Sequence, residues 1–453
     1  MRRQALTFLQ QWLTDSDRKP LVMRGARQVG KTWLVRELAR INGKKLIEIN
    51  FEKTPKVADK FSSNDPKEIL LQLHSLLDDP IDIHHSLLFL DEIQVAPDLL
   101  AKLRWFAEDL PQLPVIAAGS LLEFVLSDHA FSMPVGRIEY LHLEPLSFEE
   151  FLLAQQKNNL YDYLQTYHFQ AVIPESTHQQ LMKLFKEYVF VGGLPLAVAS
   201  WCRDRDLSKI SKMHLNLLAT YRDDFSKYCG RLSIARLEEV LEAVPKMLGQ
   251  KCIYSRISVD AQSAAVKQAL HLLEKARICH AVKHTAANGL PLGAESNQKY
   301  FKEIFLDVGL CNSLLGLNLH TITDVDEMIL VNSGGIAEQV VGQCLRTINP
   351  FYIEPTLFCW AREEKGASAE IDYIITHNAK IIPVEVKAGV TGTLKSLHLF
   401  MELKKLSLAI RINSDFPTKT NVVLKNNYEY MLLSLPFYLI GQIHRLVAIP
   451  RDS

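Results

Sequence analysis

The sequence has 453 residues, of which 48% are hydrophobic and 23% charged, which suits roughly three packed domains of about 150 residues each. Glycine and proline number only 20 and 19, so a collagenous, low-complexity or disordered chain is excluded. Basic and acidic residues balance at 51 each, but residues 201–285 carry 15 basic and 9 acidic side chains, a local charge of +6. Basic charge is therefore concentrated in the middle of the chain.

The seven cysteines lie at least 15 residues apart and form no C-x-x-C pair, which is typical of a reducing compartment and excludes a zinc ribbon. No run of 18 apolar residues occurs, and the first residues lack the apolar segment of a signal peptide. We therefore expect a cytoplasmic protein without a membrane partner.

Short apolar runs alternate with helical patterns over residues 1–150, which predicts an α/β fold with a parallel sheet and helices on both faces. The predicted strands are Leu21–Met23, Lys45–Ile49, Leu87–Leu90, Val115–Ala118 and Ile138–Leu141. Residues 151–250 are helical in pattern, residues 251–330 show helices followed by two strands, and residues 331–453 begin with a helix and become β-rich. We expect these four ranges to be separate domains.

The segment after the first predicted strand matches the phosphate-binding pattern G-x-x-x-x-G-K-[ST] and opens a helix, as this motif requires. In such a loop the backbone N–H groups surround the phosphates, and the helix N-terminus adds positive potential. Lys31 is expected to reach the β and γ phosphates, and the Thr32 hydroxyl to coordinate Mg²⁺. The expected nucleotide-binding residues are Gly25, Ala26, Arg27, Gln28, Val29, Gly30, Lys31 and Thr32.

Two carboxylates, Asp91 and Glu92, follow the third predicted strand. Asp91 is expected to hold the magnesium ion, and Glu92 to orient the attacking water or accept its proton. The alternative is that both only cap the next helix, but the phosphate-binding loop about 60 residues earlier disfavours it. Nucleotide binding is the firm prediction, and hydrolysis depends on Glu92.

Two further polar residues are candidates for the hydrolytic step. Ser120 follows the fourth predicted strand and could contact the γ phosphate or the attacking water, or it could instead be an N-cap. Arg137 precedes the fifth predicted strand and could stabilise transition-state charge, or it could be a solvated surface arginine.

Together these motifs resemble the core of an AAA+ ATPase. With Gly136-Arg137 and Leu143–Phe148, the pattern resembles a prokaryotic family of AAA+ ATPases (AAA_14 type) that carries a carboxy-terminal domain of unknown function, DUF4143. The resemblance implies ATP and Mg²⁺ as cofactors and a P-loop parallel sheet with a helical lid. It also implies that Arg137 acts in the neighbouring subunit's site, so that the protein is a homo-oligomer such as a hexamer.

The segment Gly192–Ala197 is similar to the G-L-P-L motif of signalling (STAND) NTPases, in which the proline packs against the nucleotide base. That similarity implies that Pro195 contacts the nucleotide. The alternative interpretation is a tight turn between two helices.

The range 251–330 resembles a winged-helix module. Its second helix, predicted at Ser263–Leu273, would enter the DNA major groove with Gln262, Ser263, Lys267 and Gln268 at its leading end. The local positive charge supports phosphate contact, although related modules also serve as rigid connectors.

Four residues in the range 331–453 resemble the PD-(D/E)xK nuclease pattern. Asp372 and Glu385 are predicted on adjacent strands and would converge on one divalent ion, with Lys387 on the same face as Glu385. Glu338, on a predicted helix, would complete the oxygen shell of the metal. The alternative is a fold that keeps this arrangement for a structural or DNA-binding role.

The leading hypothesis is an oligomeric ATPase that binds and remodels, or translocates along, DNA, including branched DNA. Two alternatives remain open: a nucleotide-regulated, metal-dependent nuclease, and a nucleotide switch without rapid turnover.

Overall fold

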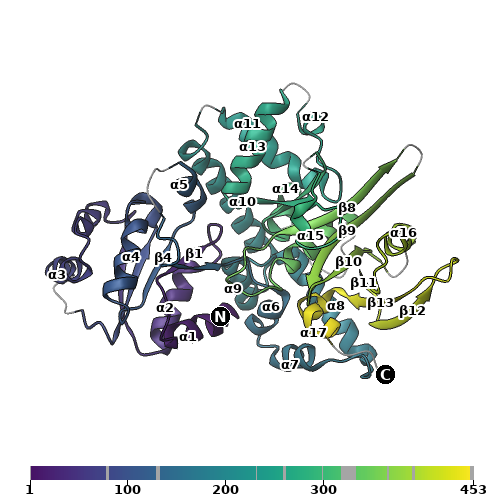
Figure 1. Cartoon of the computed structure of the whole chain (residues 1–453), viewed down its shortest axis with the longest axis horizontal. Helices are drawn as coiled ribbons and strands as arrows, with labels where there is room; N and C mark the ends of the chain where they lie inside the picture. Colours follow the sequence, from purple (N-terminus) through teal and green to yellow (C-terminus); the bar gives the residue numbers. More distant parts are fainter. Residues whose placement is uncertain are drawn as a thin grey trace. The chain divides into compact units, whose positions relative to one another are not determined.

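The computed structural model describes residues 2–77, 81–128, 133–230, 232–258, 262–297, 299–317, 333–364, 367–389 and 393–448 (Figure 1). The chain forms two compact units. The first contains Met1–Glu144 with two short later segments, Lys275–Arg277 and Pro350–Glu354, and the second contains the rest of the chain.

The first unit contains a five-stranded, wholly parallel sheet in the order β2-β3-β4-β1-β5, which confirms the predicted sheet. The strands are β1 (Leu21–Arg24), β2 (Lys45–Asn50), β3 (Ser86–Asp91), β4 (Val115–Ala118) and β5 (Glu139–His142). The helices are α1 (Ala5–Thr14), α2 (Lys31–Ile41), α3 (Pro66–Leu77), α4 (Leu99–Asp109) and α5 (Leu122–Asp128), with short 3₁₀ turns η1 (Pro55–Phe61) and η2 (Ile93–Val95).

Strand β3 lies in the interior of this sheet, and all six of its residues are buried. A continuous apolar run is what a parallel strand covered on both faces requires. Leu88 and Leu90 of β3 belong to a core that includes Leu103 and Phe106 of α4 and Leu73 of α3. Because every strand runs in the same direction, all five carboxyl ends lie at one edge of the sheet.

The second unit begins with helices: α6 (Phe148–Ala154), α7 (Asn158–Thr166), α8 (Glu175–Val191), α9 (Pro195–Asp204), α10 (Leu207–Asp224) and α11 (Ile234–Ala243). Helix α6 starts with a capping box in which Ser147 Oγ accepts from the Glu150 N–H and the Glu150 carboxylate accepts from the Ser147 N–H. Residues 151–250 are thus mainly helical, as their pattern predicted.

The remainder of the second unit is built on an eight-stranded mixed sheet in the order β12-β13-β11-β10-β9-β8-β6-β7. Its strands are β6 (Cys279–His284), β7 (Phe301–Phe305), β8 (Leu357–Glu364), β9 (Ala367–His377), β10 (Lys380–Val386), β11 (Leu408–Asn413), β12 (Thr418–Val423) and β13 (Glu429–Pro436). The helices are α12 (Tyr254–Ile257), α13 (Ser263–Lys275), α14 (Val308–Leu314), α15 (Ser333–Leu345), α16 (Lys395–Lys404) and α17 (Ile443–Ala448).

The two strands expected as a wing, β6 and β7, do pair with each other in antiparallel fashion. However, β6 also pairs in parallel with β8, with Val282 opposite Leu357 and His284 opposite Cys359. The expected ranges 251–330 and 331–453 therefore share one sheet. No helix among the described residues is long and apolar enough to cross a membrane.

Buried Asp307 joins the turn between α8 and α9 to the start of α14. One carboxylate oxygen accepts from the Gly193 N–H at 2.6 Å, and the other accepts from the Gly309 N–H at 3.0 Å. Gly192 has a positive φ of 75°, and a Cβ at this position would collide with the Asp307 carboxylate. The glycine is required both by its backbone conformation and by this contact.

We predict that Gly192→Ala destabilises the second unit because it strains φ and also displaces the Asp307 carboxylate from its hydrogen bonds. Gly230→Ala is the matched control, since Gly230 has φ 58° and a Cβ there would meet nothing within 4 Å. In urea unfolding followed by circular dichroism, Gly192→Ala should have a free energy of unfolding lower by about 1–3 kcal/mol than Gly230→Ala. Equal losses would show that the contact with Asp307 contributes nothing.

Candidate functional site

The loop between β1 and α2 has the backbone shape of a phosphate cradle. Gln28 (φ 66°) and Gly30 (φ 96°) adopt left-handed conformations, as in loops whose successive N–H groups form an anion-binding concavity. A Cβ on Gly25 would collide with the Leu143 carbonyl oxygen, so this position requires glycine. Buried Arg3 supports the loop by donating to the carbonyl oxygen of Val29 at 2.8 Å.

Lys31, the first residue of α2, is buried and its ammonium donates to the carbonyl oxygens of Gly25 (2.9 Å) and Ala26 (2.8 Å). Burial lowers the pKa of Lys31 to about 8, although the nearby carboxylates of Glu92 and Asp91 oppose the shift. A phosphate placed in the loop would offer this ammonium a stronger, charge-assisted acceptor. The lysine is thus positioned for phosphate binding.

Thr32 and Asp91 meet at the carboxyl edge of the sheet, where the Thr32 hydroxyl donates to Asp91 Oδ2 at 3.0 Å. Asn50, at the end of the neighbouring strand β2, also donates to Oδ2, at 3.3 Å. Burial, followed by the charge of Glu92, raises the pKa of Asp91. A hydroxyl beside a carboxylate is a suitable pair of oxygen ligands for Mg²⁺ in a nucleotide site.

Glu92 has a left-handed backbone (φ 53°), which turns its side chain out of the line of β3. Its carboxylate accepts from the Gln94 amide at 2.6 Å. Ser120, just after β4, is buried and its hydroxyl accepts from Arg27 Nε at 3.3 Å. Glu92 and Ser120 therefore both follow the carboxyl ends of adjacent strands, β3 and β4, and both are bonded to a neighbouring polar side chain.

A buried arginine that the sequence analysis missed lies in the first unit. The Arg277 guanidinium contacts three carboxylates: Glu123 at 2.8 Å, Glu354 at 3.3 Å and Glu144 at 3.9 Å. Glu123 also binds Arg24 of β1 at 2.9 Å, and the positive charge of Arg277 contributes to the lowered pKa of Lys31. No local pattern marks Arg277, because it is about 250 residues from the loop that it influences.

Arg137 lies at the surface of the first unit with its side chain about half exposed (49%). Its Nε binds the Glu108 carboxylate of α4 at 2.7 Å. An exposed ion pair of this kind contributes little to stability.

Pro195 lies in the second unit as the first residue of α9, directly after the turn held by Asp307. The turn is closed by the Leu146 N–H, which donates to the Gly193 carbonyl oxygen at 2.6 Å. This geometry is that of a tight turn between two helices. Contact between Pro195 and a nucleotide stays a prediction.

The four residues of the nuclease-like pattern lie close together in the second unit. Asp372 of β9 accepts from the Val386 N–H of β10 at 2.8 Å, beside Glu385, which binds Lys387 at 2.7 Å. Glu338 of α15 faces the same cluster. Lys302 of β7, which the sequence pattern did not indicate, also joins the cluster, and its ammonium contacts both Glu338 (2.9 Å) and Asp372 (3.4 Å).

A divalent ion does not fit this cluster as it stands. Among the described residues, no group of three or more His, Cys, Asp or Glu side chains is arranged to hold a metal. Burial opposes the charge on Lys302, but Glu338, Asp372 and Glu370 outweigh it and raise the pKa of Lys302 well above its ordinary value. The Lys302 ammonium therefore lies among the carboxylates that the ion would need.

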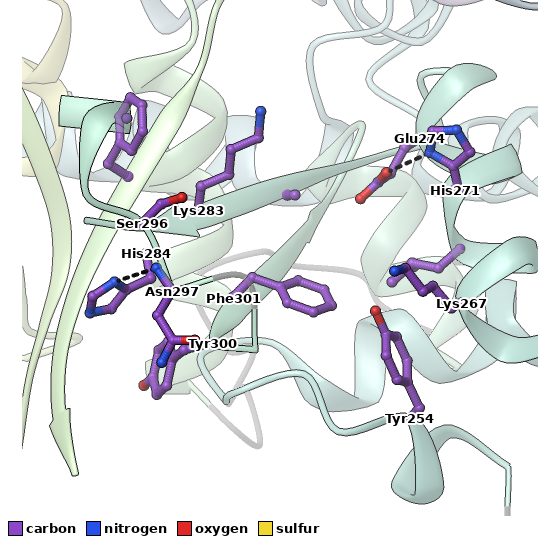
Figure 2. A pocket seen from close by; sticks show the side chains of 14 residues that line it. Tyr254, Lys267, His271, Glu274, Lys283, His284, Ser296, Asn297, Tyr300 and Phe301 are labelled. Carbon is purple, nitrogen blue, oxygen red and sulfur yellow. Dashed lines mark hydrogen bonds and ion pairs between the residues drawn. The ribbon is translucent and has the colours of Figure 1, made fainter. Parts of the chain in front are cut away.

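A cavity of about 440 Å³ opens in the second unit between α12, α13, β6 and β7 (Figure 2). Its wall combines aromatic rings with cations; the aromatic residues are Tyr254, Tyr300, Phe301 and Phe358, and the lysines are Lys267 and Lys283. In Figure 2 the Phe301 ring lies between Tyr254 and Tyr300, and the Phe301 and Tyr254 ring centroids are 6.0 Å apart. Within the described part of the chain, neither lysine ammonium has an ion-pair partner.

Three family models match separate parts of the chain. An AAA domain matches residues 17–152, a domain of unknown function (DUF8612) matches residues 182–321, and another (DUF4143) matches residues 333–433. None of the curated proteins matches the sequence.

Several solved structures are similar to this chain. A Walker-type ATPase of Pyrococcus abyssi is 17% identical, with a TM-score of 0.43 over 70% of this chain and 95% of that one. PCH-2 of C. elegans is 13% identical, with a TM-score of 0.27 over 43% and 59%. A signal transduction ATPase with numerous domains and a tetratricopeptide repeat sensor, from Pyrococcus horikoshii, is 12% identical, with a TM-score of 0.24 over 77% and 46%. The chain thus spans less than two thirds of the last two proteins.

The AAA domain match includes the phosphate-binding loop, Asp91, Glu92 and Ser120. Residues 17–152 therefore match an AAA domain and residues 333–433 a DUF4143 domain, which confirms the resemblance found in the sequence.

Proposed function

We propose that this protein is a Mg²⁺-dependent, oligomeric ATPase that couples ATP hydrolysis to binding and to remodelling of, or translocation along, DNA. The observation that carries the ATPase part is the Thr32–Asp91 hydrogen bond at 3.0 Å, beside a buried Lys31 within its glycine loop. Groups of these kinds bind phosphate and magnesium in P-loop sites, and their position at one edge of the sheet supports the proposal.

Each residue of the site has a proposed role. The N–H groups of Gly25–Gly30 and the Lys31 ammonium bind the phosphates, and Thr32 and Asp91 hold Mg²⁺, which offsets phosphate charge when bound. Glu92 orients the attacking water and accepts its proton, while Ser120 contributes a polar contact to the γ phosphate. Pro195 packs against the base.

Arg137 is proposed to act on the nucleotide of a neighbouring subunit, which makes a homo-oligomer, such as a hexamer, the active form. Its half-exposed guanidinium and its weak surface partner, Glu108, support this role. An arginine supplied by another molecule stabilises charge that develops on the transferred phosphate.

The DNA part of the proposal is supported by the cavity beside α13. Aromatic rings can stack on unpaired bases, and Lys267 and Lys283 can bind the adjacent phosphates. A single strand, rather than a closed duplex, offers bases to such a cavity, which suits a protein that acts on branched DNA. The +6 charge of residues 201–285 favours the same partner.

We predict that Glu92→Gln lowers ATP turnover by about 10²–10⁴-fold while MgATP binding persists, because the amide no longer accepts a proton from water. Turnover is measured by phosphate release and binding by calorimetry. Glu37→Gln, which alters an exposed ion pair with Arg40 on α2, should leave both unchanged. Normal turnover in Glu92→Gln would show that another group is the base.

The alternative function, a nucleotide switch, has its own test. Negligible turnover of the unmodified protein, purified with tightly bound ADP, would favour the nucleotide switch.

The action of Arg137 between subunits is tested by mixing two inactive variants. Arg137→Ala keeps its phosphate site but lacks the arginine, and Lys31→Ala loses phosphate binding but retains Arg137. Each alone should be inactive, and mixing them should restore measurable phosphate release, because a Lys31→Ala subunit can complete the site of its Arg137→Ala neighbour. No recovery in mixed oligomers, verified by light scattering, would place Arg137 outside the neighbour's site.

For the cavity, we predict that Lys267→Glu combined with Lys283→Glu weakens single-stranded DNA binding by about tenfold or more and lowers its salt dependence. Binding is measured by fluorescence anisotropy with labelled oligonucleotides over a range of salt concentrations. Lys212→Glu combined with Lys425→Glu makes the same change in net charge at exposed positions outside the cavity. Equal losses in both double variants would mean that only overall charge matters.

A further inference from the structure

Lys302 is the most enclosed cation of the acidic cluster in the second unit. Its side chain is only 4% exposed, and its ammonium contacts three carboxylates, those of Glu338, Glu370 and Asp372. These carboxylates come from α15 and β9, whereas Lys302 comes from β7, which is separated from β9 in the sheet by two strands, β8 and β6. The folded sheet, not the local sequence, brings them together.

Some of the remaining oxygens of the cluster also have partners within the chain. Asp372 uses Oδ2 to accept from the Val386 N–H at 2.8 Å, and Glu385 uses Oε1 to accept from the Lys387 ammonium at 2.7 Å. Glu338 Oε1 packs so closely against Gly249 that a Cβ there would lie 2.7 Å away. These contacts tie the acidic groups to the chain, although Glu385 Oε2 is buried without a hydrogen-bond partner among the described residues.

A divalent ion and the Lys302 ammonium would compete for the same oxygens. Mg²⁺ requires nearly octahedral oxygen ligands at about 2.0–2.1 Å, so it would have to displace the ammonium from Glu338 and Asp372. Two positive charges within about 4 Å also repel strongly when both are shielded from water. The covalently attached cation is always present, whereas a metal ion must be bound from solution.

We propose that the Lys302 ammonium takes the place of the divalent ion, so that the nuclease-like cluster of this protein is metal-free and serves as a structural ion-pair network. Because metal-dependent hydrolysis has no ion to use, the carboxy-terminal domain contacts its partner without cutting it. This last point rests on the proposed DNA-binding function, but the occupancy of the cluster by Lys302 does not.

The test is a Mn²⁺ titration by calorimetry and electron paramagnetic resonance, without nucleotide or DNA. All samples carry Asp91→Asn, which removes the magnesium ligand of the nucleotide site. The background variant should bind no Mn²⁺ at the cluster. Adding Lys302→Met, which keeps the length of the side chain and removes its charge, should create binding of about one Mn²⁺ per chain. Adding Asp372→Asn to Lys302→Met should abolish it.

Two results would overturn the proposal. The first is Mn²⁺ binding by the background variant that disappears when Asp372→Asn is added, since a metal would then bind beside Lys302; this measurement does not depend on whether Lys302→Met folds. The second is a folded Lys302→Met protein, verified by circular dichroism, that gains no Mn²⁺ binding. Neither result depends on ATP turnover or DNA affinity, so the proposed function can fail while this inference stands, or the reverse.

Discussion

The hydrogen bond between Thr32 and Asp91 is the contact on which the nucleotide site depends. It joins the first turn of α2 to the end of β3, two segments about 60 residues apart in the sequence. It can form because β1 and β3 both flank β4 in a parallel sheet, so that their carboxyl ends lie side by side. The register of β3 therefore determines whether Asp91 can reach Thr32. If the strand were shifted by one residue, Asp91 would lie on the other face of the sheet.

Buried charged groups occur in both units, and three of them have partners of opposite charge or backbone donors within the chain. Arg277 is surrounded by three carboxylates, Asp307 accepts hydrogen bonds from backbone N–H groups, and Lys302 lies among three acids. An unmatched buried ion would be costly, so each such group constrains the elements around it. These contacts join segments distant in sequence, such as β7 and α15, into single cooperative units.

Much of the first unit could be predicted from sequence because its signals are local. The apolar run Leu87–Leu90 ends in two carboxylates, and the loop Gly25–Thr32 carries its own pattern of glycines and a lysine. All five predicted strands are present within a few residues of their expected ends. Asn50 and Arg3, by contrast, support the site through contacts that no local pattern indicates. These two residues belong to no motif, and they become part of the site only when the chain folds.

In the second unit, the sequence by itself indicated helices and strands. The tertiary structure determined which of them share one sheet and which side chains meet at the acidic cluster. The acidic pattern of Glu338, Asp372 and Glu385 with Lys387 was readable in order along the chain, and these residues do gather in space. What only the fold decided is that β6 and β7 join the same sheet and carry Lys302 into the cluster. The physical reason is that the periodicity of side chains along a strand or helix is a property of the local sequence. Which cation pairs with a buried carboxylate depends instead on which side chains lie close to it in the folded protein.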